Sequence, residues 1–365
     1  MPARSPTQPK PSASAHSFAS AAKGAFLPSR EPSAVIFGCA GPSLSARERA
    51  FFRDTDPVGF ILFKRNCENP DQVRALVREL RETIGRADAP VLIDQEGGRV
   101  ARLQPPHWRK YPAAATLGAL GSERAEEAVR LAARLIADDL AALGISVDCV
   151  PVLDVPQPGA SPVIGDRAYS SNPAEVARLG KAACEGLLEG GVLPVIKHIP
   201  GHGRANVDSH DALARVTAPR AELDATDFEP FRALSDMPWA MTAHIVYSAI
   251  DAEAPATLSA LVIREVIRAN MGFDGVLVSD DLSMKALGGP IGARAARALA
   301  AGCDLALHCN GNAEEMTDVA AATAPLTPGA RRRLNRSEAR RHAPAPLDRR
   351  AAEARLDALL GVGAA

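Results

Sequence analysis

The sequence predicts an α/β protein that folds as a single (β/α)8 barrel of the TIM type, and three observations lead to this class. Eight short apolar runs of strand length recur between residues 34 and 308. Longer segments with apolar residues three and four positions apart separate most of them, which is the spacing of amphipathic helices. Polar and ionisable residues follow seven of the runs, at the strand ends where such barrels place their active sites.

The eight runs are apolar at nearly every position, which is typical of parallel strands that are buried on both faces. In chain order they span residues 34–39, 59–63, 90–94, 145–150, 192–197, 240–244, 275–280 and 303–308. Helices are predicted at residues 69–84, 122–143, 173–190, 259–271 and 292–301. Eight such units predict closure into a barrel. A doubly wound open sheet is the alternative, and it is less favoured because no G-x-G-x-x-G follows the first run.

The composition is that of an ordinary soluble globular protein, with 47% hydrophobic and 23% charged residues. A formal net charge of -1 argues against nucleic acid as a partner. No apolar window is long enough to predict a transmembrane helix, so we expect no membrane association. The six cysteines contain no C-x-x-C pair and predict reduced, buried thiols.

Three regions are predicted along the chain. Residues 1–31 are rich in Pro, Ser and Ala and lack the apolar core of a secretory signal, so we expect a flexible extension and a cytoplasmic location. Residues 32–325 form the catalytic barrel, and residues 326–365 form a charged helical tail packed on it. Little chain follows the eighth strand, so any catalytic acid or base is expected to come from the barrel's own loops.

The third predicted strand runs into D-Q-E-G-G-R-V-A-R at residues 94–102. Its two glycines permit a tight turn, so Arg102 can reach back toward Asp94 at the strand end. Such a carboxylate would bind hydroxyl groups, and the guanidinium would bind a second hydroxyl or a carbonyl group. The alternative is a salt bridge that steadies the loop, a role for which Glu96 and Arg99 are the better candidates.

A polar loop after the fourth strand contains Arg167, a candidate ligand for a polar substrate, and ends in Asn172-Pro173, which predicts the start of a helix. The fifth strand ends in K-H-I-P-G-H-G at residues 197–203. Proline and glycine break any helix there, so His198 and His202 do not form the helical metal-binding pair of zinc proteases.

Asp208 and His210 follow in the same loop. If the loop folds back, they can share a hydrogen bond in which the carboxylate fixes the imidazole tautomer and raises its basicity, which would make them an acid/base pair. A solvated polar loop is the alternative. The seventh strand ends in S-D-D-L-S-M at residues 279–284, and successive side chains alternate across a strand. Asp280 is therefore the candidate nucleophile, and Asp281 is expected to cap the following turn.

Together, the segments at residues 94–102, 197–210 and 279–284 resemble the glycoside hydrolase family 3 β-N-acetylglucosaminidases of the peptidoglycan-recycling type. The resemblance extends from about residue 34 to about residue 310 in the family's order. It implies that Asp280 is the catalytic nucleophile and that His210, paired with Asp208, is the general acid/base. The matching sugar-binding positions are Asp94, Arg102, Arg167, Lys197 and His198.

The resemblance implies a retaining β-N-acetylhexosaminidase that removes terminal non-reducing β-N-acetylglucosamine from muropeptides carrying 1,6-anhydro-N-acetylmuramic acid. We expect no metal or other cofactor, a small-molecule sugar substrate as partner, and a monomer. Three alternatives stay open: a phosphorylase on the same scaffold, a metal-dependent hydrolase that uses several of the histidines, and a catalytically silent sugar-binding barrel.

Overall fold

The computed structural model describes residues 31–205 and 213–362. The predicted extension at residues 1–31 therefore lies outside the described chain, except for Glu31. Every element below belongs to the compact unit that starts at Pro32. In the described part of the chain, no helix is both long enough and apolar enough to cross a membrane.

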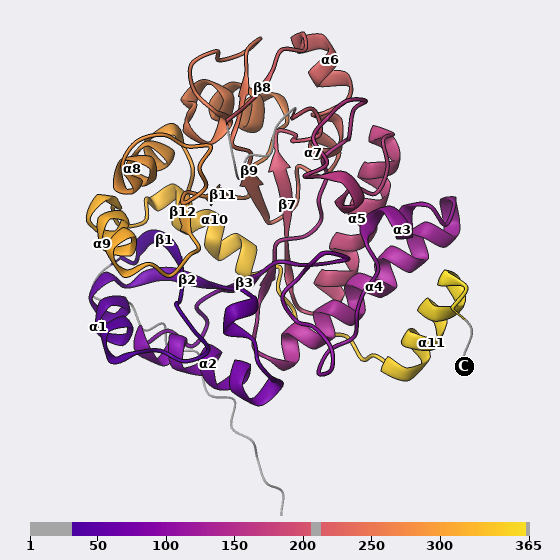
Figure 1. The fold of residues 1–365 in the computed structure, drawn as a ribbon, viewed down its shortest axis with the longest axis horizontal. Coiled ribbons are helices and arrows are strands. Elements are labelled where there is room, and N and C mark those ends of the chain that lie inside the picture. The colour runs from indigo at the N-terminus through magenta and orange to yellow at the C-terminus, as the bar shows by residue number, and fades with distance from the viewer. Residues whose placement is uncertain (1–30, 206–212, 363–365) are drawn as a thin grey trace, which may run out of the picture. The chain divides into compact units, whose positions relative to one another are not determined.

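Eight parallel strands close into a barrel, which confirms the predicted fold class (Figure 1). Around the barrel the strands follow the order β1-β12-β11-β9-β7-β6-β3-β2. Pairing of β1 with β12 closes the ring, with Val35 opposite Ala306. The bounds are β1 (Ser33–Gly38), β2 (Pro57–Leu62), β3 (Val91–Ile93), β6 (Val147–Asp148), β7 (Leu193–Ile199), β9 (Trp239–Thr242), β11 (Val276–Asp281) and β12 (Leu305–His308).

Helices surround the barrel, and side chains at their first turns bind free backbone N–H groups. Helix α5 begins at Pro173, as the Asn-Pro pair predicted, and the Asn172 side chain accepts from the N–H of Ala174. The α-helices are α1 (Ala46–Thr55), α2 (Pro70–Thr83), α3 (Ala114–Gly118), α4 (Ser122–Ala142), α5 (Pro173–Glu189), α6 (Arg220–Ala225), α7 (Glu229–Ala233), α8 (Ile291–Ala301), α9 (Ala313–Ala322), α10 (Pro328–Glu338) and α11 (Arg349–Leu360). The predicted helix at 259–271 is a π-helix, η4 (Val262–Asn270), and short 3₁₀ turns form η1 (Lys64–Asn66), η2 (Gly165–Arg167) and η3 (Ala256–Leu258).

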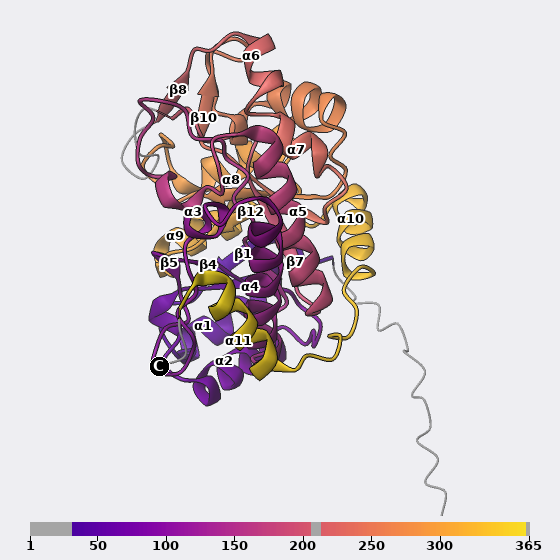
Figure 2. The same ribbon diagram turned by 90° about the vertical axis from the view of Figure 1, so that its right-hand side faces the viewer.

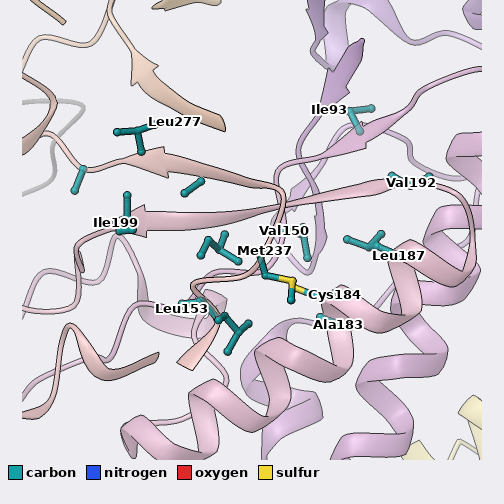
Figure 3. Packing of buried hydrophobic residues seen from close by; sticks show 14 of the residues in the cluster. Ile93, Val150, Leu153, Ala183, Cys184, Leu187, Val192, Ile199, Met237 and Leu277 are labelled. Carbon is teal, nitrogen blue, oxygen red and sulfur yellow. The ribbon is translucent and has the colours of Figure 1, made fainter. Parts of the chain in front are cut away.

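Two apolar layers hold the barrel together. The outer layer lies between the strands and the surrounding helices. Figure 3 shows Ala183, Cys184 and Leu187 of α5 near Val150, which follows β6, and Val192, which precedes β7. The inner layer fills the barrel itself with side chains from all eight strands, among them Ile36, Ile61, Leu92, Val147, Val195, Met241, Val278 and Leu307. The interior of the barrel is therefore a packed core rather than a channel.

The C-terminal tail, which was predicted to be helical, forms two separate helices rather than one continuous helix. Pro344 and Pro346, which lack the N–H that a helix needs, lie in the stretch between α10 and α11. Helix α10 closes the bottom of the barrel, where Leu326 and Ala330 join the inner layer and Trp239 donates to Ser337 over 2.6 Å. Helix α11 lies along α4 (Figure 2).

Two small sheets stand at the mouth, at the end opposite α10 (Figure 2). One is a hairpin of β4 (Gln95–Gly97) and β5 (Val100–Ala101), and the other pairs β8 (Ala214–Val216) with β10 (Ile245–Tyr247) in parallel. The first hairpin lies where the sequence predicted a turn that brings Arg102 back toward the barrel.

Candidate active site

Two carboxylates and three cations form a continuous ion-pair network at the barrel mouth. Lys197 Nζ lies 2.8 Å from Asp94 Oδ1 and 2.7 Å from Glu96 Oε1. Arg102 donates to Asp94 Oδ2 over 3.0 Å, and Arg167 donates to both oxygens of Glu96 over 2.8 Å each. Because the Lys197 and Glu96 side chains are only 2% and 7% exposed, water screens these attractions weakly. The network is therefore rigid and strongly coupled.

The network keeps every member charged. Burial alone would raise the pKa of Asp94, but Lys197 and Arg102 outweigh it and hold that pKa well below its usual value. In the same way Lys197 and Arg167 overcome burial and lower the pKa of Glu96 to about 2. Burial would lower the pKa of Lys197, but the two carboxylates raise it above its usual value. With three cations and two carboxylates, the network itself carries one net positive charge.

The hairpin between β4 and β5 determines where Arg102 lies. Gly97 and Gly98 turn the chain with φ values of 89° and 55°, in the left-handed region that favours glycine. The Gln95 side chain then accepts the backbone N–H of Arg102 over 2.9 Å. The Arg102 guanidinium lies over the ring of Phe63, 4.9 Å from its centroid. Backbone and ring thus fix the guanidinium beside the strand ends.

Arg99 fastens the loop that carries Arg167. Its Nε donates to Asp166 over 2.8 Å, and its Nη2 donates to backbone carbonyl groups of residues 162–164. This agrees with the predicted loop-steadying role of Arg99. The same role was predicted for Glu96, which pairs with Arg167 of this loop and, through Lys197, also belongs to the ion-pair network. The hairpin and the loop are therefore joined across the cavity rim.

A buried aspartate orients His198. Asp154 Oδ2 lies 2.7 Å from His198 Nδ1, and its Oδ1 accepts the N–H groups of His198 and His202 over 3.1 and 2.6 Å. Although burial alone would raise the pKa of Asp154, the histidines and these hydrogen bonds lower it. The carboxylate fixes the tautomer with the proton on Nδ1, which turns Nε2 of His198 toward the cavity. Burial lowers the pKa of His202 to about 4.

The two carboxylates at the end of β11 have different surroundings. Asp281 accepts the N–H and Oγ–H of Ser283 over 3.0 and 2.6 Å, so it holds the following turn, as predicted. Asp280 lines the cavity, and its Oδ1 accepts the N–H of Asp281 over 2.8 Å. Burial would raise the pKa of Asp280, but His244 and His198, together with that hydrogen bond, lower it. Asp280 is therefore a carboxylate at neutral pH.

These side chains converge on one cavity of about 350 Å³ at the barrel mouth. Its floor consists of Ile61, Met241 and Leu307 from the inner layer. Its walls carry the polar groups Asp94, Glu96, Arg99, Arg102, Arg167, Lys197, His198, His202, Asp280 and Asp281. An apolar floor with a few convergent polar groups suits a small polar ligand such as a sugar ring.

The model of the glycosyl hydrolase family 3 N-terminal domain matches residues 38–340. This chain belongs to glycosyl hydrolase family 3.

Relatives and solved structures agree with the family 3 assignment. A beta-hexosaminidase of Methylococcus capsulatus is 41% identical over 82% of this chain and 90% of its own length. One from Neisseria meningitidis serogroup B is 38% identical over 76% of this chain and 78% of its own. NagZ from Neisseria gonorrhoeae, solved with N-trifluoroacetyl-D-glucosamine, is 32% identical with a TM-score of 0.83, covering 92% of this chain and 100% of that one. The protein is thus a glycoside hydrolase of the β-hexosaminidase group.

The family 3 residues predicted from the sequence gather as expected wherever the structure describes them. The cavity is lined by Asp94, Arg102, Arg167, Lys197, His198 and Asp280. The predicted acid/base pair, Asp208 and His210, lies outside the described residues.

Two histidines at strand ends turn away from the cavity. His244 Nδ1 lies 2.8 Å from Thr257 Oγ1, and its Nε2 lies 3.0 Å from the backbone oxygen of Asp281. His308 Nε2 lies 3.0 Å from Glu315. Not every polar strand end therefore contributes to the site. Within residues 31–205 and 213–362, no group of three or more His, Cys, Asp or Glu side chains could hold a metal ion.

Three contributors were placed at strand ends by the sequence but were given no part in ligand binding: Gln95, Glu96 and Asp154. Glu96 follows Asp94 by two positions, and side chains two apart in an extended segment point to the same side. That spacing could have indicated its place in the network. Gln95 and Asp154 act largely on backbone N–H groups, and no residue pattern indicates such contacts.

Proposed function

We propose that the protein hydrolyses terminal, non-reducing β-N-acetylglucosamine from muropeptides that carry 1,6-anhydro-N-acetylmuramic acid, with retention of configuration, in peptidoglycan recycling. One observation carries the proposal: the Asp280 carboxylate lines the same cavity as the network around Lys197. A nucleophile and a polar ligand cradle in one sugar-sized cavity are what a retaining glycosidase needs. The names of the relatives above support the hexosaminidase activity.

Asp280 is the proposed nucleophile. Its Oδ1 is engaged by the N–H of Asp281, which leaves Oδ2 to attack the anomeric carbon. The bond between that carbon and Oδ2 forms as the bond to the leaving oxygen breaks, and the leaving oxygen takes up a proton. Water then attacks the glycosyl-enzyme ester, so that two inversions give net retention.

The network around Lys197 is the proposed sugar-binding surface. Asp94 can accept from sugar hydroxyl groups, while Lys197, Arg102 and Arg167 can donate to hydroxyl or carbonyl oxygens. His198 presents Nε2 to the same space. These groups are paired to one another before the sugar arrives, so little reorganisation is needed on binding.

The proposed proton donor is His210, with Asp208 as its partner. An imidazole with a pKa near neutrality can donate a proton to the leaving oxygen and later take one from water. This assignment rests on the sequence and on the family resemblance.

Turnover of aryl β-N-acetylglucosaminides with a good and a poor leaving group tests both roles. Asp280→Ala should lose at least about 1,000-fold in kcat/KM on both substrates, because it removes the proposed nucleophile. His210→Ala should lose mainly on the poor leaving group, which needs the proton. The surface variant Asp138→Asn on α4 is the control. Activity of Asp280→Ala close to wild type would refute the mechanism.

Product analysis tests the substrate and the stereochemistry. Incubation with 1,6-anhydro muropeptides should release free N-acetylglucosamine, seen by mass spectrometry, and proton NMR should detect the β-anomer first. Formation of the 1-phosphate in phosphate buffer would instead identify a phosphorylase. Release of the α-anomer first would contradict retention.

A further inference from the structure

A third carboxyl group lies buried beneath the two carboxylates of the ion-pair network. Asp148 ends β6, between Ile93 of β3 and Pro194 of β7, and is 0% exposed. Its Oδ1 accepts the backbone N–H of Gln95 over 2.9 Å. Its Oδ2 is buried and has no hydrogen-bond partner among residues 31–205 and 213–362. A buried polar atom without a hydrogen-bond partner destabilises the fold, so a partner such as a buried water is expected at Oδ2.

A small internal cavity of about 20 Å³ adjoins Asp148. Its polar lining residues are Glu96, Asp148, Tyr111 and Tyr169, and the remaining lining is apolar. This volume suffices for one water molecule, and carboxyl and hydroxyl groups supply the polar partners that a buried water needs. Glu96 lines both this cavity and the cavity at the barrel mouth, so it connects the two.

The surroundings of Asp148 favour its neutral form. Burial raises the pKa of Asp148 to about 8, and the negative charges of Asp94 and Glu96 add to this, while Lys197 and the Gln95 N–H oppose it. Tyr169, which shares the small cavity, stays neutral because burial raises its pKa well above the usual value. At neutral pH the acid therefore carries a proton that its Oδ2 can donate.

We propose that Asp148 is a positioning residue for the sugar site: as a neutral carboxylic acid it donates through one buried water to Glu96, which holds Glu96 between Lys197 and Arg167. This inference rests on the proposed function, in which the network around Lys197 binds the sugar. Loss of the Asp148 proton places a third negative charge beside Asp94 and Glu96. The shared Lys197 is then drawn away from its place, and affinity for the sugar falls.

The test measures the affinity of N-acetylglucosamine, which has no titrating group, for the full chain by calorimetry between about pH 6.5 and about pH 9.5. Wild-type affinity should fall about tenfold, which is the change expected for one lost charge-assisted hydrogen bond. The midpoint of the fall should lie near pH 8. Asp148→Asn cannot ionise, and its change over the same range should stay within about twofold. The control Asp138→Asn, on the surface of α4, should follow the wild type.

Infrared titration of the free protein gives a second readout. The carbonyl stretch of a protonated carboxyl group should disappear near pH 8 in the wild type and in Asp138→Asn. It should be absent from Asp148→Asn. If Asp148→Asn does not fold, Glu96→Gln takes its place: removing one neighbouring negative charge should move the infrared midpoint to lower pH.

The outcomes separate the two proposals. Sugar binding that does not change with pH, or a fall that persists in Asp148→Asn, would overturn the role of Asp148 while leaving the proposed function intact. No loss of the infrared band near pH 8 would also overturn it. Failure of the wild type to bind N-acetylglucosamine at about pH 6.5 would overturn the proposed function and this inference together.

Discussion

Replacement of Lys197 by methionine removes the cation that two buried carboxylates share. The side chain is 2% exposed, and its Nζ lies within 2.8 Å of both Asp94 and Glu96. Methionine is a similarly long unbranched side chain, so it fills most of the same space without the charge. After the change Asp94 keeps Arg102 and Glu96 keeps Arg167, so each carboxylate loses one of its two cations.

The cost follows from these contacts. Removing one partner of a buried ion pair destabilises a protein by about 3–5 kcal/mol, because the other charge stays buried without compensation. Each carboxylate here keeps an arginine, so we expect Lys197→Met to lower the free energy of unfolding by about 3 kcal/mol, the lower end of that range. Lys181→Met is the matched control. Lys181 is 67% exposed and 4.0 Å from Glu185, and such surface pairs contribute at most about 1 kcal/mol.

Urea unfolding at neutral pH, followed by the fluorescence of Trp108 and Trp239, measures both variants. Both tryptophans are buried, so their emission reports the loss of the core. In a double-mutant cycle, Lys197→Met combined with Glu96→Gln should lose less stability than the sum of the two single losses, because the two side chains form a buried ion pair. A loss in Lys197→Met no larger than that in Lys181→Met would refute the argument that the network depends on this lysine.

Four further predictions concern pH, the loop and the thiols. The lowered pKa values of Asp94 and Glu96 stabilise the fold above about pH 4.5, and this stabilisation is lost as the pH falls toward 2. The Tm should therefore drop across that range, and it should drop less steeply in Glu96→Gln. The raised pKa of Asp148 has the opposite sign: its contribution to stability is lost as the pH rises from about 4 to about 8, so Asp148→Asn should exceed the wild type in Tm by more at pH 8 than at pH 5. A constant difference would contradict this. Arg99→Ala releases the loop at residues 162–166 and should raise KM about tenfold with little change in kcat in steady-state assays, while an unchanged KM would show that the loop holds without it. Burial raises the pKa of all six cysteine thiols, so iodoacetamide at neutral pH should not inactivate the native protein, and rapid inactivation would show an exposed thiolate.

The barrel could be predicted because its strands have a simple pattern. All six residues of β1 and all six of β2 are buried, and runs that are apolar on both faces indicate parallel strands under helices. The role of α10 could not be predicted in this way. Its segment is rich in arginine, and only the placement of Leu326 and Ala330 against the inner layer shows that it closes the barrel.

Functional residues at strand ends could be predicted from the sequence, but the ion pairs between residues far apart in the chain could not. Asp94 follows β3 and Lys197 lies near the end of β7, so their convergence was expected. They lie 103 positions apart, however, and no local pattern indicates that they form an ion pair. Asp148 was not predicted as a functional residue, because a single aspartate inside an apolar run gives no sign of its partners or its protonation state. Its protonation depends on neighbours that only the closed barrel brings together.

The closure of the barrel by α10 affects how the protein is made. A ribosome releases the last strand, β12, about twenty residues before the helix that seals the lower end of the barrel. Until α10 emerges, the nascent barrel exposes Trp239 and its inner layer to water, and Trp239 lacks the Ser337 acceptor that its ring nitrogen uses in the finished protein. Synthesis from the amino terminus therefore leaves the last step of core formation to the carboxyl-terminal segment, and a chain cut before Leu326 retains an open apolar end that other proteins can bind.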